Sequence, residues 1–144
     1  MADRLVVTRL SHACLGSSDL ARTIGFYCNL FGCTIAHEFR TDAGELYGVF
    51  LDCHNGTFLE FFKQEAAMGQ EGLFRHLCLQ VEDITAAAES LRSAGLDPEI
   101  RRGRTDRVLQ CFVQDPDGTR IELQQHDEQS VLYPLIYGSG AGRG

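Results

Sequence analysis

Residues 50–62 read FLDCHNGTFLEFF, and residues 112–124 read FVQDPDGTRIELQ. The two stretches match at a constant offset of 62 residues, at Phe50/Phe112, Gly56/Gly118, Thr57/Thr119 and Glu60/Glu122. In each, two runs that favour β-strands flank a polar turn that contains glycine, which is the pattern of a hairpin. The matched positions indicate that one module occurs twice in the chain.

A second repeated pair lies upstream of the hairpins. Residues 12–20 read HACLGSSDL, and residues 76–84 read HLCLQVEDI. In both, a histidine is followed two places later by cysteine, three places later by leucine and seven places later by aspartate. The two histidines are 64 residues apart, so the register of the copies differs by only two residues of loop length. We interpret the chain as a duplicated and fused module, with the boundary in the polar stretch from Lys63 to Gly72.

The first module, about residues 5–63, predicts a strand, a helix and three further strands. Asp19 is a suitable N-cap for a helix from Leu20 to about Phe31, and Gly32 would end that helix. Asn55-Gly56 predicts a hairpin turn between the last two strands. The expected strands are Val6–Leu15, Ile35–Arg40, Tyr47–Asp52 and Thr57–Lys63.

The second module, about residues 73–126, repeats this order. Asp83 would cap a helix over Ile84–Ala94, Gly95 would stop it, and residues 115–118 would form a turn. The expected strands are Phe74–Val81, Glu99–Arg102, Val108–Gln114 and Thr119–Gln125. Two tandem βαβββ modules predict an α+β fold in a single domain over residues 1–126. The apolar segment within residues 127–137 would cover this domain, and residues 138–144 would be a disordered tail.

The composition is that of an ordinary globular protein and argues against disorder. The 144 residues are 44% hydrophobic and 23% charged, with a formal net charge of −7. This acidic balance disfavours a nucleic-acid binder, which usually has a basic surface. No apolar run approaches the roughly 20 residues that cross a bilayer. The N-terminal residues do not resemble a secretory signal, so we expect a cytoplasmic protein. We expect neither a membrane nor a nucleic-acid partner. The six cysteines would be free thiols.

One histidine and one glutamate of each module occupy matching positions. His12 and His76 lie in the first predicted strands, and Glu60 and Glu122 lie in the last, among large apolar residues. A charged group in such surroundings is costly to bury without a partner. A single histidine on a strand is more often an ordinary core or surface residue. The coincidence of two histidines and two glutamates in register instead predicts one divalent metal site, suited to Zn²⁺, Ni²⁺, Co²⁺, Mn²⁺ or Fe²⁺.

The paired modules, with HLCLQVEDI and DPDGTRIEL, resemble the vicinal oxygen chelate superfamily of glyoxalase I, methylmalonyl-CoA epimerase, extradiol dioxygenases and the fosfomycin and bleomycin resistance proteins. The resemblance covers about residues 5 to 126. It implies that the strands form a cup-shaped, partly open β-barrel with the helices outside and the metal within. It also implies a homodimer, with the site either within one chain or shared between subunits.

The resemblance also implies a reaction class. His12, Glu60, His76 and Glu122 match the two-His, two-Glu ligand set of glyoxalase I, whereas the epimerase usually has Gln in place of Glu60. This implies a lyase or isomerase in which Glu122 or Glu60 removes the proton next to a carbonyl and a metal-bound enediolate forms. The alternatives are an Fe(II) extradiol-type dioxygenase, which uses two His and one Glu, and a drug-binding resistance protein of the bleomycin or fosfomycin type.

Strand alternation predicts which side chains would contact a substrate. Phe58 and Phe62 share the face of Glu60, while Leu59 and Phe61 would pack against helices. Likewise, Arg120 and Gln124 share the face of Glu122. This set favours a small oxygenated substrate with an apolar portion, with a carboxylate near Arg120. The alternative interpretation is that the phenylalanines only fill the barrel. Similarly, the run of arginines in residues 101–107 would either bind an anionic tail or simply be solvated.

Overall fold

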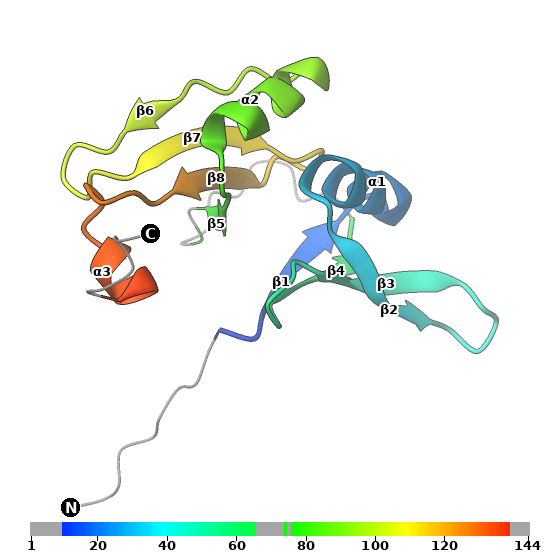
Figure 1. Cartoon of the computed structure of the whole chain (residues 1–144). Coiled ribbons are helices and arrows are strands. Elements are labelled where there is room, and N and C mark those ends of the chain that lie inside the picture. Colours follow the sequence, from blue (N-terminus) through cyan, green and yellow to red (C-terminus); the bar gives the residue numbers. More distant parts are fainter. Residues whose placement is uncertain (1–9, 66–73, 75, 139–144) are drawn as a thin grey trace, which may run out of the picture. The chain divides into compact units, whose positions relative to one another are not determined.

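The computed structural model describes residues 10–65, 74 and 76–138 (Figure 1). The chain divides into two compact units, Met1–Gly69 and Gln70–Gly144. Each unit has one four-stranded sheet and is described here by itself. The expected start of the first strand, the module boundary and the expected disordered tail lie wholly or largely outside the described residues.

Unit 1 contains β1 (His12–Ser17), α1 (Leu20–Phe31), β2 (Thr34–Arg40), β3 (Leu46–Asp52) and β4 (Phe58–Lys63). The strand order in its sheet is β1-β4-β3-β2. Strand β1 pairs with β4 in parallel, and the other neighbours are antiparallel. Because β1 and β4 are adjacent, residues from the two ends of the module lie side by side.

Local signals in the sequence define helix α1. The Asp19 carboxylate accepts a hydrogen bond from the backbone N–H of Arg22 at 3.0 Å, and Gly32 ends the helix with φ of 66°. The helix lies against one face of the sheet (Figure 1), where its Tyr27 ring is 5.0 Å from the Phe61 ring. This face holds the core of unit 1.

Unit 2 has the same topology. It contains β5 (Leu77–Gln80), α2 (Ile84–Ser93), β6 (Arg101–Arg102), β7 (Leu109–Gln114) and β8 (Arg120–Gln125), with strand order β5-β8-β7-β6. Asp83 caps α2 by accepting from the backbone N–H groups of Thr85 and Ala86. Helix α2 packs on β7 and β8, where Ile121 and Leu123 are buried. A short helix, α3 (Tyr133–Tyr137), follows the sheet.

The predicted α+β fold of two tandem βαβββ modules is confirmed, and the two sheets are open. The cup between them stays a prediction. Several strand boundaries differ from expectation by one residue. The larger differences are that β5 begins at Leu77, so that His76 precedes the strand expected to contain it, and that β6 has two residues. The expected cover segment contains a helix. None of the helices in the described ranges is long and apolar enough to cross a membrane.

Candidate metal centre

In unit 1, His12 and Glu60 face each other across the parallel strands β1 and β4. The Nε2 atom of His12 lies 3.8 Å from Oε2 of Glu60. The Glu60 side chain is 13% exposed and the His12 side chain is 43% exposed. Cys14 is the register partner of Glu60 on β1. Burial, and then a hydrogen bond and the charge of Glu60, raise the pKa of the Cys14 thiol, which favours a protonated thiol beside the carboxylate.

In unit 2, His76 and Glu122 form the equivalent pair. The Nε2 atom of His76 lies 2.8 Å from Oε2 of Glu122, with the side chains 38% and 6% exposed. The second carboxylate oxygen, Oε1, accepts a hydrogen bond of 2.9 Å from the Gln124 side chain. Burial, followed by the Glu122 charge, raises the pKa of Cys78 to about 12. Each carboxylate oxygen of Glu122 therefore has a polar partner, His76 for Oε2 and Gln124 for Oε1. The raised pKa of Cys78 favours a protonated thiol beside this pair.

A phenylalanine lies beside each His–Glu pair, at a position that the sequence did not mark as a site residue. Phe50 on β3 is the register partner of Glu60, and its ring meets the His12 ring edge-on at 5.5 Å. Phe112 on β7 is the register partner of Glu122 and meets His76 edge-on at 6.0 Å. The sequence did contain a signal for them, because Phe50 and Phe112 are separated by the same 62 residues as Glu60 and Glu122. The duplication thus repeats a side-chain arrangement as well as a backbone order.

The candidate residues of unit 1 lie on the face of the sheet opposite α1. Leu59 and Phe61 are buried on the helix side, as alternation predicts, whereas Glu60 points the other way. Phe58 lines a hollow of about 270 Å³ together with Ser11, His12, Ala36, His37 and Phe50. The hollow is mainly apolar and opens beside the His12 imidazole. Phe62 instead packs with Phe39 and Tyr47, which supports its interpretation as filling.

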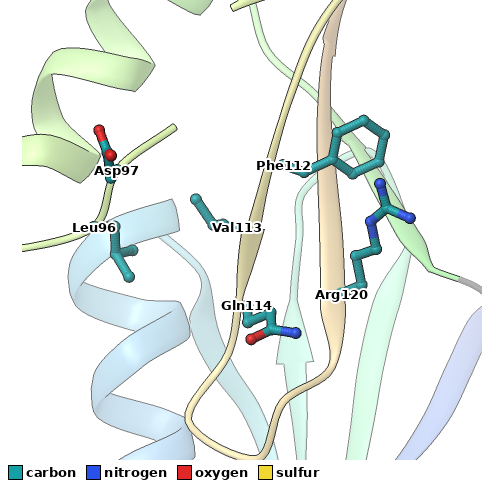
Figure 2. Close-up of a pocket in the computed structure, with 6 residues that line it drawn as sticks. All are labelled: Leu96, Asp97, Phe112, Val113, Gln114 and Arg120. Atoms are coloured by element: carbon teal, nitrogen blue, oxygen red, sulfur yellow. The ribbon is translucent and has the colours of Figure 1, made fainter. Parts of the chain in front are cut away.

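Arg120 lies beside the phenylalanine of unit 2. Its guanidinium carbon is 4.0 Å from the centre of the Phe112 ring, a cation–π contact. Both residues line a hollow of about 340 Å³, together with Leu96, Asp97, Val113 and Gln114. Figure 2 shows the Arg120 guanidinium beside the Phe112 ring. The structure therefore places one cation on the strand that carries Glu122, two residues away.

The run of arginines in residues 101–107 is largely engaged by neighbouring groups. Arg101 and Arg102 form β6 and pair with Glu99 and Asp127, respectively. Arg107 donates to the side chain of Gln129 at 3.3 Å. Because Arg101 and Arg102 are already paired with carboxylates, fewer of these arginines are available to bind an anionic tail than the sequence suggests.

The donor chemistry of both pairs fits a divalent metal. Two donor atoms that each lie about 2.1 Å from one ion are about 3.0–3.4 Å apart for bond angles of about 90–110°. The observed separations of 3.8 Å and 2.8 Å fall on either side of this range. Within the part of the chain that the structure describes, no group of three or more His, Cys, Asp or Glu side chains forms a metal cluster. The structure thus brings together two His–Glu pairs, each within its own unit, as candidate ligands.

Known proteins share this fold and its sequence pattern. The chain is 28% identical over 129 residues to a probable lactoylglutathione lyase from Vibrio cholerae, covering 83% of this chain and 92% of that protein. A glyoxalase family protein from Enterococcus faecalis superposes with a TM-score of 0.68 at 24% identity, over 81% of this chain and 97% of the other.

A more distant neighbour was solved with a metal. A variant of the fosfomycin resistance protein FosX from Listeria monocytogenes, complexed with Mn(II) and 1S,2S-dihydroxypropylphosphonic acid, superposes with a TM-score of 0.69 at 16% identity. The match covers 90% of this chain and 99% of that protein. The family model described as Glyoxalase/Bleomycin resistance protein/Dioxygenase superfamily matches residues 9–123. With most of its length inside that match, the chain belongs to this superfamily.

Proposed function

We propose that the protein is a metal-dependent lyase or isomerase of the glyoxalase I type. In this proposal His12, Glu60, His76 and Glu122 together hold one divalent ion: Ni²⁺, Co²⁺, Zn²⁺ or Mn²⁺. The observation that carries the proposal is the repeated His–Glu–Phe arrangement. In both units the glutamate lies on the last strand and the phenylalanine on the strand beside it, while the histidine is the first residue of β1 in unit 1 and directly precedes β5 in unit 2. The lactoylglutathione lyase named among the relatives supports the reaction class, and the Mn(II) complex of FosX supports the metal.

The alternative explanation of each pair is an ion pair between an imidazolium and a carboxylate. Duplication alone could have given both units this pair. However, residues 50–62 and 112–124 are identical at only four of thirteen positions, and the glutamate is one of the four, which one ion that needs both pairs would explain. When bound, a divalent ion would polarise a substrate carbonyl and so acidify the neighbouring C–H bond. Imidazole nitrogens and carboxylate oxygens are suitable donors for such an ion.

The carboxylates would move the proton. Glu122 is the better placed of the two, because Gln124 holds its Oε1 atom and leaves Oε2 on the side of His76. A carboxylate oriented in this way can take the proton next to the carbonyl and return it to the neighbouring carbon. Glu60 is the equivalent candidate in unit 1, where the apolar hollow beside His12 would exclude water from the substrate.

The hollows indicate the kind of substrate. Phe50 and Phe58 beside His12 favour an apolar portion, and Arg120 favours a carboxylate or another anionic group. We therefore propose a small oxygenated substrate such as a 2-oxo aldehyde or its thiol adduct. A homodimer and a cytoplasmic location complete the proposal.

A second candidate is a resistance protein of the fosfomycin type. The observation that favours it is the likeness to FosX together with the cation that Arg120 provides for a phosphonate. In this alternative the same four residues would hold the metal. An Fe(II) extradiol-type dioxygenase is a third possibility, and oxygen-sensitive iron in the purified protein would favour it.

The decisive experiment is a screen of the metal-loaded protein with 2-oxo aldehydes, with and without thiols such as glutathione, beside fosfomycin and a catechol. We expect turnover of the aldehyde adducts, with solvent deuterium appearing at the carbon next to the carbonyl. Glu122→Gln should abolish this proton exchange, while Glu89→Gln, an exposed change of the same kind on α2, should leave it intact. Exchange that continues unchanged in Glu122→Gln would remove Glu122 from this role.

A further inference from the structure

Two cysteines of unit 1 meet at the ends of neighbouring strands. Cys33 immediately precedes β2, Cys53 immediately follows β3, and their sulfur atoms are 3.7 Å apart. Cys33 is buried and Cys53 is half-buried. The pair lies on the α1 side of the sheet, because Cys53 continues the alternation of Val49 and Leu51, which are both buried. It is therefore separate from the His12–Glu60 pair on the opposite face.

The backbone around the two cysteines suits a disulfide. Thr34 pairs with Asp52 and Ile35 with Leu51, so Cys33 and Cys53 are the next opposed positions. The N–H of Cys33 bonds to Tyr27 and the N–H of Cys53 to Thr57, so the two cysteines do not exchange backbone hydrogen bonds. Directly opposed residues without such bonds have Cα atoms about 4.5 Å apart, within the roughly 4.4–6.8 Å that a disulfide spans.

The two thiols have different chemical roles. A hydrogen bond from Cys33 lowers the pKa of Cys53, and the backbone N–H of Leu59 acts in the same direction, against burial and the charge of Asp52. The same hydrogen bond, followed by burial and charges that include Cys28 and Asp52, raises the pKa of Cys33. Cys53 is also the more exposed of the two, so a reagent from solvent reaches its sulfur first, and the buried Cys33 is placed to react second.

We propose that Cys33 and Cys53 form a reversible disulfide when the protein meets a hydroperoxide. The Cys53 thiolate attacks the peroxide, the O–O bond breaks, and an alkoxide or hydroxide leaves and takes up a proton, so that Cys53 becomes a sulfenic acid. The Cys33 sulfur then displaces water from that sulfenic acid and forms the S–S bond, losing its own proton. The two sulfurs together lose two electrons, which the peroxide gains. A dithiol reductant reverses the change.

The disulfide would join β2 to β3 where both strands meet the C-terminal end of α1. It would close the chain between residues 33 and 53 into a loop. Since a closed loop of this size restricts the unfolded chain, the oxidised protein should have a higher unfolding midpoint, by about 5–10 °C. This effect requires no metal and no substrate.

The test is to treat the reduced full-length protein with stoichiometric hydrogen peroxide, then to unfold it in denaturant and label the remaining thiols with a maleimide. Intact mass should show two fewer adducts than the six of the reduced chain, and dithiothreitol should restore them. Tryptic mapping should link the peptide that contains Cys33 to the peptide that contains Cys53. Six adducts after peroxide treatment, or a disulfide between chains, would overturn the proposal.

A matched control is needed because no lysine or arginine separates Cys28 from Cys33, so both lie on one tryptic peptide. Cys28→Ser should keep the cross-link and the higher midpoint, whereas Cys33→Ser should lose both. Since Cys33 is buried and its replacement can impair folding, Cys53→Ser provides the same readout from the half-buried partner. A cross-link lost in Cys28→Ser and kept in Cys33→Ser, or an unchanged midpoint after oxidation, would contradict the assignment.

Discussion

Replacing Glu122 with glutamine tests the carboxylate that the proposal places at the metal. Its side chain is 6% exposed, with Oε2 at 2.8 Å from His76 and Oε1 at 2.9 Å from Gln124. Glutamine has nearly the same shape but replaces one acceptor oxygen with an NH₂ donor. In one orientation this NH₂ faces the amide donor of Gln124, and in the other it faces His76. In both, the negative charge that a cation requires is lost.

The size of the effect follows from linkage between binding and folding. Free metal at about 100 times its dissociation constant stabilises the folded wild-type protein by about 2.7 kcal/mol. Because loss of a residue that only orients a ligand already weakens metal binding by about 10–100-fold, we take the loss of the ligand itself as at least about 100-fold. At the same metal concentration, the stabilisation of Glu122→Gln would then fall to about 0.4 kcal/mol.

Thermal unfolding with and without metal measures this difference. Without metal, Glu122→Gln should lie within about 1 kcal/mol of wild type, because removing a buried charge offsets the lost charge-assisted hydrogen bond. Glu89→Gln, the exposed control, should respond to metal as wild type does. A metal-induced shift in Glu122→Gln as large as that of wild type would refute the reasoning.

Three further predictions concern stability. Phe61→Ala should lower the free energy of unfolding by about 3–5 kcal/mol in denaturant, because Phe61 is fully buried against α1. Phe62→Ala should lower it by less than about 2 kcal/mol, and the reverse order would mean that the two faces of β4 are misassigned. Gly48→Ala should destabilise by about 1–3 kcal/mol, because the new methyl group would overlap the Phe62 ring, and adding Phe62→Leu should recover part of the loss. The hydrogen bond from Arg102 lowers the pKa of Asp127 to about 2, from an ordinary 3.8. The Asp127 carboxylate therefore stabilises the fold above about pH 4, and this stabilisation is lost as the pH falls towards 2. In acid unfolding, Asp127→Asn should lack the loss of stability that wild type shows between about pH 4 and 2.

Local rules predicted the elements whose ends carry strong signals. Helix α1 begins after Asp19 and ends at Gly32 as expected, since a side-chain cap and a left-handed glycine act within a few residues. The repeat predicted that Glu60 and Glu122 occupy equivalent strands, and the structure has both in the last strand of their sheets.

Other features depend on contacts that sequence periodicity does not contain. Helix α3 has five residues with a proline in its first turn and no side-chain cap, so no periodic pattern identifies it. The contact between Cys33 and Cys53 depends on the register of β2 against β3, which shifts after Ile35. Likewise, Arg102 pairs with Asp127, which is 25 residues further along the chain. The sequence alone therefore overstated how many arginines of residues 101–107 could bind an anion.

The metal content of the purified protein tests the central claim most directly, measured beside His12→Ala and His76→Ala. If the two pairs share one ion, wild type should hold one metal per chain, whether the site lies within a chain or across a dimer, and each variant alone should lose it. Two ions per wild-type chain with one retained in each variant, or a metal content unchanged by either replacement, would contradict a shared centre.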